Sequence, residues 1–420
     1  MQPLEPDCRR PAAVLSLPKR HAFRPSTRLL VSVLCCLISV PALAGSALIR
    51  VSDGTMTHEG KIVGLSRTTC SLMDRQGQLT HLSVGTLHDF EKVSARYEPF
   101  PVTTFREQLR KEFSGKYEVV GTTHYLVCAP SGRASRYAQL FESIYRDVEQ
   151  FYRVRGFKVQ VPEVPLVAVV FGSQQEFSAY CVQDNVTPSA SLMGYYSLRS
   201  NRVALFDDAN LVSATDDTGS QSHRRVIALP ARLSGMSQCY LPFSAGQFPI
   251  AAAAAVSGNT ANTIIHETTH QVGYNIGIHS RLGGTPIWIV EGLATVLEPA
   301  GMRKKTGRQL QQGRINQERA QWFVKRQRPG RAMGSLAKLV AADSYFFQQT
   351  LNSYSEAWSF TFFLLENPSR RRDLVTYLQI LRSRDPLLQY TSAERLSDFQ
   401  KAFGNISRIE VEFIRYMDRL

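Results

Sequence analysis

Two histidines and a glutamate stand at the spacing that a metal site on a helix requires. Residues 262–273 contain the pattern HExxH, with His266, Glu267 and His270 at its fixed positions. Residues four apart lie on one face of an α-helix, so both imidazoles can reach one ion, whereas Glu267 projects about 100° around the axis. We therefore predict that His266 and His270 bind a metal and that Glu267 takes a proton from a water beside it. The alternative is an amphipathic helix on which the pattern arose by chance.

A third ligand has to come from another part of the chain. Metzincins continue as HExxHxxGxxH, but Ile276 stands where their third histidine would be, and His279 comes three residues late. Further on, Pro286 suits the first turn of a second helix. That helix would carry Glu291, which lies 21 residues beyond His270 (291 − 270).

This arrangement resembles the gluzincin metallopeptidases, in which HExxH is followed on a later helix by a glutamate, often within the pattern W-x-x-E-G-x-A. The residues that fit this pattern are Trp288, Glu291, Gly292 and Ala294. Within that class the chain looks most like the bacterial DUF1570 group of secreted, peptidase-MA-like proteins, with a resemblance that extends from about residue 45 to the C-terminus. The resemblance implies one Zn²⁺ ion held by His266, His270 and Glu291, and peptide-bond hydrolysis as the activity.

Two further roles follow from the resemblance. Gluzincins of the aminopeptidase type hold the oxyanion with a tyrosine roughly sixty residues after the ligand glutamate, and Tyr354 lies 63 residues after Glu291 (354 − 291). The alternative is a tyrosine that only packs at the start of a helix. Many gluzincins also carry an acidic residue four positions after the ligand, which orients a ligand histidine. Here that position is Thr295, and Glu298 is the candidate substitute.

The order of strands and helices predicts an α+β protein in which a small β module precedes a zincin-like domain. Residues 45–98 contain short runs that indicate a small antiparallel barrel or sheet of about five strands, with a turn at 75–77. This module has no cluster of titratable residues, so it is either a binding module or a packing accessory. The zincin-like domain occupies residues 99–420 and includes an insert at 210–258. The insert is too long for a simple connection, and we interpret it as an active-site lid or a disordered flap.

Within the zincin-like domain, three segments have recognisable patterns. The apolar run 165–171 predicts a strand buried on both faces, and 194–207 predicts a pair of strands. The resemblance places residues 196–206 at the sheet edge along which an extended peptide substrate pairs. Residues 308–420 indicate four or five amphipathic helices, which would form the helical half of a zincin.

The N-terminus is typical of an exported protein. A basic segment precedes an apolar run of sixteen residues at 29–44, which ends in the small-x-small cleavage site Ala-Leu-Ala. That run is too short to span a bilayer, so residues 1–44 are predicted to be a signal peptide, with an uncleaved anchor as the alternative. The mature protein would be secreted or periplasmic, without a stable membrane span. It would keep four cysteines, among which Cys181 and Cys239 form the favoured disulfide.

Charge and motif content narrow the class of partner. The net charge of +14 falls to about +10 without the leader (14 − 6 + 2), and a surplus of that size favours an acidic envelope polymer as a partner besides a peptide or protein substrate. No stretch interleaves basic and aromatic residues and no nucleic-acid motif occurs, so nucleic-acid binding is not expected. The sequence therefore predicts a secreted zinc metallohydrolase that acts as a peptidase. The alternative is a catalytically inactive zincin-fold binding protein of the cell envelope.

Overall fold

The computed structural model describes residues 47–113, 115–189, 192–206, 260–303 and 311–420. The predicted signal peptide, the insert and Cys239 all lie outside these ranges. The other three cysteines of the predicted mature chain, Cys70, Cys128 and Cys181, are buried free thiols. No helix of the described residues has the length and the apolar character needed to cross a membrane.

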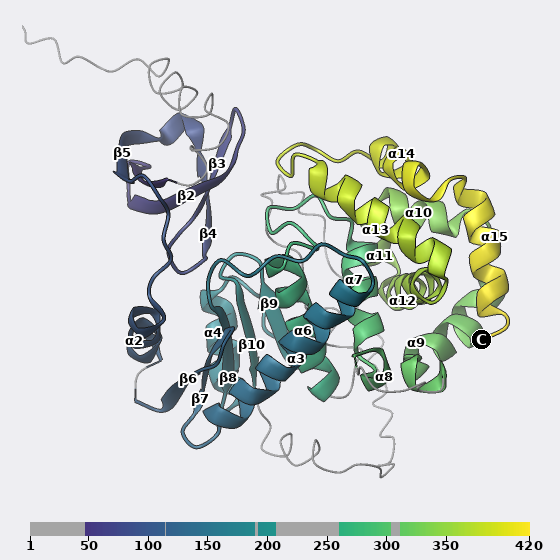
Figure 1. The fold of residues 1–420 in the computed structure, drawn as a ribbon, viewed down its shortest axis with the longest axis horizontal. Coiled ribbons are helices and arrows are strands. Elements are labelled where there is room, and N and C mark those ends of the chain that lie inside the picture. Colours follow the sequence, from purple (N-terminus) through teal and green to yellow (C-terminus); the bar gives the residue numbers. More distant parts are fainter. Residues whose placement is uncertain (1–46, 114, 190–191, 207–259, 304–310) are drawn as a thin grey trace, which may run out of the picture. The chain divides into compact units, whose positions relative to one another are not determined.

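The N-terminal module is an open sheet (Figure 1). Its five antiparallel strands pair in the order β4-β3-β2-β1-β5, which leaves β4 and β5 at opposite edges. The predicted sheet is therefore confirmed, whereas a closed barrel is wrong. Strand β5 has no buried residue, so it has no apolar face to turn towards a barrel interior. The strands are β1 (Leu48–Ser52), β2 (Thr57–Leu65), β3 (Thr69–Met73), β4 (Leu79–Ser83) and β5 (His88–Ser94).

This module packs against the rest of Gly45–Leu420, which forms one compact unit. Met73 and Leu79 bury their side chains together with Leu282 from a distant loop. The backbone N–H of Leu79 also donates to the carbonyl of Arg199, at 2.8 Å. These contacts join the module to the rest of the described chain, and both predicted roles of the module, binding and packing, stay predictions.

The second sheet lies at the base of the candidate site. Its strand order is β6-β7-β8-β10-β9, in which β7, β8 and β10 run parallel and the two edge strands run antiparallel to their neighbours. The predicted strand at 165–171 is the central strand β8, and all six of its residues are buried. The strands are β6 (Tyr117–Gly121), β7 (Tyr125–Pro130), β8 (Leu166–Phe171), β9 (Gly194–Ser197) and β10 (Arg202–Phe206).

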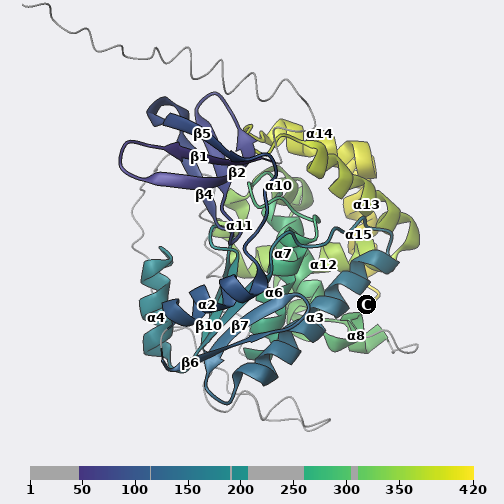
Figure 2. The ribbon, with the colours of Figure 1, turned by 60° about the vertical axis from the view of Figure 1, so that its left-hand side comes forward.

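Helices cover both faces of this sheet, which is why β8 is apolar throughout. Leu166, Ala168 and Val170 face the core that contains α3 (Ala134–Val154) and α6 (Thr260–Asn275). The alternate residues of β8 face a second core with α2 (Val102–Glu112) and α4 (Gln174–Gln183). Figures 1 and 2 show this arrangement of helices around the sheet.

The sheet edge differs from the prediction. Residues 196–206 were expected to form the edge as a whole, but β10 is hydrogen-bonded to β8 on one side and to β9 on the other. Only β9 lies at the edge. The physical reason is the tight turn at 199–201, which folds β9 back outside β10.

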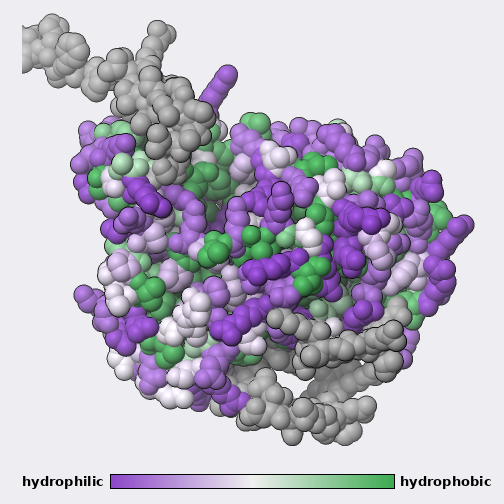
Figure 3. Space-filling view, in the orientation of Figure 1, coloured by the Kyte–Doolittle hydropathy of each residue, from purple (hydrophilic) through white to green (hydrophobic). Residues whose placement is uncertain are grey.

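The C-terminal half is helical, as predicted, but it contains more helices than four or five. Seven α-helices follow residue 311, because three of them have only five to seven residues, too short to show a helical period in the sequence. They are α9 (Gln317–Trp322), α10 (Ser335–Ala341), α11 (Ser344–Gln348), α12 (Thr350–Glu366), α13 (Pro368–Ser383), α14 (Ser392–Phe403) and α15 (Ile406–Met417). The result is a mixed α+β protein with two small sheets. On the face drawn in Figure 3, hydrophobic residues are interspersed among hydrophilic ones over the described part of the chain.

Candidate metal centre

Helix α6 carries the HExxH pattern and is fixed to the sheet by polar contacts. The Gln271 side chain donates to the carbonyls of Val167 and Asn201, at 2.9 and 2.7 Å. Asn275, one turn later, donates to the Asn201 side chain at 2.7 Å. The helix ends at Asn275, and Gly277, with φ +83°, follows in the left-handed region that such an ending requires. These contacts set the rotation of α6 about its axis, and so they decide where its histidines point.

Helix α7 (Ile287–Leu297) carries Glu291 and is apolar around its whole circumference. Such a helix has to be buried on all sides. Trp288 anchors it by packing against Phe360 and Tyr377, with ring centroids 5.4 and 5.7 Å away. The tryptophan of the W-x-x-E-G-x-A pattern is therefore a packing residue that places Glu291 inside the protein.

The three side chains that the sequence singled out as metal ligands lie together. His266 Nε2 is 3.0 Å from His270 Nε2 and 3.2 Å from Glu291 Oε2, and His270 Nε2 is 3.5 Å from that oxygen. Ligand bonds of about 2.1 Å in tetrahedral geometry separate neighbouring ligand atoms by about 3.4 Å. The three atoms thus have the spacing of one face of a coordination tetrahedron, and this buried group could hold a metal ion.

The electrostatics of the group also favour a cation. Burial by itself would lower the pKa of His266, but hydrogen bonds to the carboxylates of Glu291 and Glu298 raise it to about 10. Burial would raise the pKa of Glu291, yet the neighbouring histidines His270 and His266 hold it well below its usual range. The buried carboxylates therefore stabilise positive charge at this point.

Glu298 orients one of the histidines. Its Oε1 lies 2.9 Å from His266 Nδ1, and its Oε2 accepts a hydrogen bond from Asn316 at 2.6 Å. Thr295, at the position where many gluzincins have an acid, donates instead to the carbonyl of Glu291 within the same helix, at 2.7 Å. Glu298 makes the contact to the ligand histidine, as its position seven residues after Glu291 allowed. Asn316 was missed, because no motif surrounds it.

We expect Glu298→Gln to weaken metal binding by about 10- to 100-fold, because the histidine loses the carboxylate that fixes its tautomer and orientation. Metal affinity would be measured by competition with a chelating indicator. Thr295→Val is the matched control on the same helix face and should leave the affinity within about twofold. Equal affinities in the wild type and Glu298→Gln would show that Glu298 has no part in the site.

Glu267 lies beside the group and is completely buried. Its Oε2 accepts a hydrogen bond from the backbone N–H of Tyr196 in the edge strand β9, at 2.8 Å. Its other oxygen, Oε1, has no hydrogen-bond partner among the described residues. Burial raises the pKa of Glu267 to about 7, although the charges of His266 and His270 oppose the shift. A carboxylate of this kind can both accept and release a proton near neutral pH.

A close helix crossing brings Tyr354 towards Glu291. A Cβ added to Gly292 would lie 2.2 Å from Thr361 Oγ1 and 2.8 Å from the carbonyl of Ala357, so only glycine lets α12 approach α7 here. Tyr354 is buried at the start of α12. Its pKa is raised first by burial and next by the negative charge of Glu291, the predicted ligand.

Gly292→Ala should therefore lower the free energy of unfolding by about 3 kcal/mol, because the two helices have to move apart. Urea unfolding would measure the change. Adding Thr361→Ala removes the nearest atom and should restore part of the loss, whereas the backbone carbonyl remains in the way. Gly330→Ala is the control, since a Cβ there meets nothing within 4 Å; as large a loss for Gly330→Ala would contradict the steric explanation.

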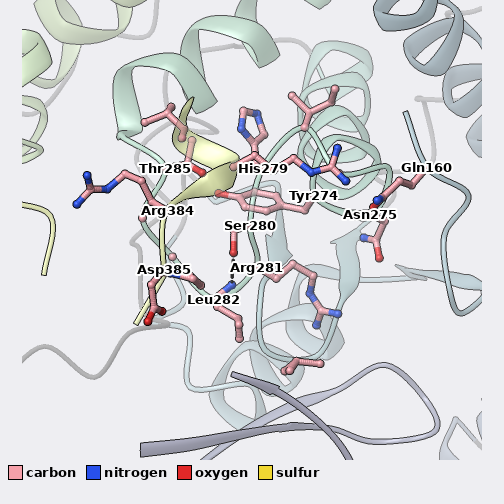
Figure 4. Close-up of a pocket in the computed structure, with 18 of the residues that line it drawn as sticks. Gln160, Tyr274, Asn275, His279, Ser280, Arg281, Leu282, Thr285, Arg384 and Asp385 are labelled. Atoms are coloured by element: carbon pink, nitrogen blue, oxygen red, sulfur yellow. Dashed lines mark hydrogen bonds between the residues drawn. The ribbon is translucent and has the colours of Figure 1, made fainter. Parts of the chain in front are cut away.

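A cavity of about 380 Å³ lies next to the end of α6 (Figure 4). Figure 4 shows Arg384 and Asp385 on one side and Gln160 and Asn275 on the other. His279, which comes too late in the sequence for a metzincin ligand, lines this cavity and is buried. It does not join the ligand group of the described residues. Burial lowers its pKa to about 3, so it is neutral.

The fold and the site together define a mixed α+β protein with a buried His-His-Glu group that could hold a metal ion. Residues 260–388 match the family described as "Protein of unknown function (DUF1570)", which confirms the resemblance over that segment. The match begins at α6 and ends after α13, so it contains every candidate site residue, but it is shorter than the expected range from residue 45 onwards. No curated protein matches the chain.

Proposed function

We propose that this protein is a zinc-dependent metallohydrolase of the zincin type that cleaves peptide bonds. The observation that supports this proposal best is the convergence of three donor atoms, His266 Nε2, His270 Nε2 and Glu291 Oε2, within 3.5 Å of one another. Two imidazoles and one carboxylate are the donor set of catalytic zinc sites that leave one position open. The adjacent carboxylate of Glu267, with one buried oxygen lacking a partner, supplies the group that a hydrolytic site needs in addition.

Zn²⁺ held by these three residues would supply Lewis acidity, which acidifies a water and polarises a carbonyl. Glu267 then acts as general base: its free Oε1 accepts the proton of the attacking water and later delivers it to the leaving amine. Because Oε2 is held by the N–H of Tyr196, the carboxylate keeps one orientation during both transfers. The same hydrogen bond ties the base to β9, the edge strand of the described sheet, along which an extended peptide could pair.

Tyr354 is proposed to donate its phenol hydrogen to the oxyanion. We expect Tyr354→Phe to lower kcat by about 100-fold or more and to leave metal affinity unchanged, because only the transition state loses a hydrogen bond. An unchanged kcat in this variant would leave Tyr354 with a packing role only.

The test of the activity is a peptide library incubated with the purified chain lacking residues 1–44, with Zn²⁺ or with a chelator. Cleavage that stops with chelator and returns with added Zn²⁺ is the expected result. Zinc binding at one ion per chain without any cleavage would instead support the inactive binding protein. Export to the periplasm or the medium also remains a proposal, and it would be checked by fractionating cells that express the full chain.

A further inference from the structure

Arg319 is a buried cation whose charge acts on the carboxylate of its chain neighbour Glu318 but which forms no close ion pair with it. The residue is 3% exposed, yet within the described residues its guanidinium makes neither a hydrogen bond nor an ion pair. The guanidinium lies over the ring of Tyr354, whose centroid is 5.6 Å from Cζ. By contrast, the equally buried Arg202 holds both carboxylate oxygens of Glu112, at 2.5 and 3.0 Å.

Such a group is unfavourable for the fold on its own. A guanidinium carries five N–H donors and a charge that is not lost at any physiological pH. Burying it without a hydrogen-bonded carboxylate costs free energy that the cation–π contact and the nearby charge of Glu318 only partly offset. A buried polar group without partners in a native structure therefore calls for an explanation, and a bound ligand is one.

Both polar groups of the Arg319 backbone, its N–H and its carbonyl, are hydrogen-bonded to residues that lead to the metal group or to Tyr354. Its N–H donates to the side chain of Asn316, at 3.3 Å, and Asn316 in turn donates to Glu298. Its carbonyl accepts a hydrogen bond from Ser355, at 2.7 Å. Ser355 follows Tyr354 on α12, and Glu298 holds His266. Arg319 is thus tied to the predicted zinc ligands through one neighbour and to the predicted oxyanion donor through another.

We propose that Arg319 binds a carboxylate of the substrate, so that the preferred peptides present a carboxylate near the scissile bond. The planar fork of a guanidinium matches a carboxylate with two parallel hydrogen bonds. The carboxylate comes either from the C-terminus of the peptide, which would make the enzyme a carboxypeptidase, or from an acidic side chain. This inference rests on the proposed peptidase function for the identity of the ligand, but the binding itself does not require turnover.

The test measures binding to the zinc-loaded Glu267→Gln chain, in which hydrolysis is not expected. Three N-terminally labelled peptides are compared by fluorescence anisotropy: one with a free C-terminus, the same sequence amidated, and the amidated sequence with one internal residue replaced by glutamate. We expect a carboxylate-bearing peptide to bind about 30-fold more tightly than the plain amide. Whichever carboxylate-bearing peptide shows this preference identifies the source of the carboxylate as the C-terminus or an acidic side chain. In Arg319→Gln the carboxylate-bearing and plain amide peptides should bind with about equal affinity. The affinity for the plain amide should stay within about twofold of that of the chain that keeps Arg319.

Arg326→Gln is the matched control, because Arg326 is exposed and loses the same charge. It should keep the full preference for the carboxylate. Thermal unfolding separates a ligand site from a structural role: removing an unpaired buried charge should leave Tm unchanged or raise it. A lower Tm in Arg319→Gln, or a preference that survives the substitution, would overturn the inference. Selective binding by a chain that cleaves no peptide would refute the proposed hydrolysis and leave the carboxylate site in place.

Discussion

Glu267→Gln should abolish peptide cleavage while the protein stays folded and keeps its metal. General-base catalysis typically contributes 10²- to 10⁴-fold, so we expect kcat to fall by about 10³-fold or more. The amide oxygen can still accept the hydrogen bond from Tyr196, and a neutral amide costs less to bury than a carboxylate. Tm should therefore be unchanged or raised. Cleavage rates of a peptide from the library and the zinc content of the purified variant are the two measurements.

Glu118→Gln serves as the control. The substitution also replaces an acid by its amide, but at an exposed position on β6. It should retain full activity. A Glu267→Gln protein with undiminished turnover would remove the mechanism, even if zinc were bound. A variant that lost both zinc and activity would mean that Glu267 supports the metal group and would leave its role as a base unproven.

Glu291→Gln should remove most of the stabilisation that zinc confers. At free Zn²⁺ about 1,000-fold above Kd, a site present only in the folded state adds about 4 kcal/mol to the free energy of unfolding. Since the outer-shell partners of ligands already change affinity by 10- to 100-fold, loss of a ligand carboxylate should weaken binding by about 100-fold or more. At the same zinc concentration the variant would then gain no more than about 1.4 kcal/mol.

Urea unfolding with and without Zn²⁺ measures both increments on the same preparation. Thr295→Val, one turn after Glu291 on α7, is the matched control and should show the full wild-type increment, because the Thr295 hydroxyl bonds only to carbonyls of its own helix. If wild type and Glu291→Gln gained equally from zinc, Glu291 would not be a ligand. If neither gained, the metal-centred interpretation of the site would be wrong.

Features carried by local periodicity could be read from the sequence. The spacing of His266 and His270 places both on one helix face, and the structure has that helix at Thr260–Asn275. The apolar run in β8 predicted a strand buried on both faces, which is confirmed. Glu291 was predicted through a resemblance and not through geometry, because 21 residues separate it from His270 (291 − 270). Periodicity gives no information about two helices that far apart.

Other predictions depended on how segments meet, and there the sequence was less reliable. The β module has the expected strands but is an open sheet, because β5 offers no buried face. The predicted substrate edge is β9 alone, since β10 is paired on both sides. The short helix α9, with six residues, shows no period in the sequence. Asn316 and Arg319, at its start, could not be recognised as neighbours of the metal group.

The sequence by itself determined which residues could bind a metal and on which face of a helix the two histidines stand, because backbone geometry repeats every few residues. Only the tertiary structure decided that Glu291 and Glu298 contact that face and that Arg319 lies against Tyr354. Their positions depend on side-chain packing between distant segments, such as the crossing at Gly292 that brings α12 against α7. Contacts of this kind arise from the shape of the whole core, and no local pattern encodes them.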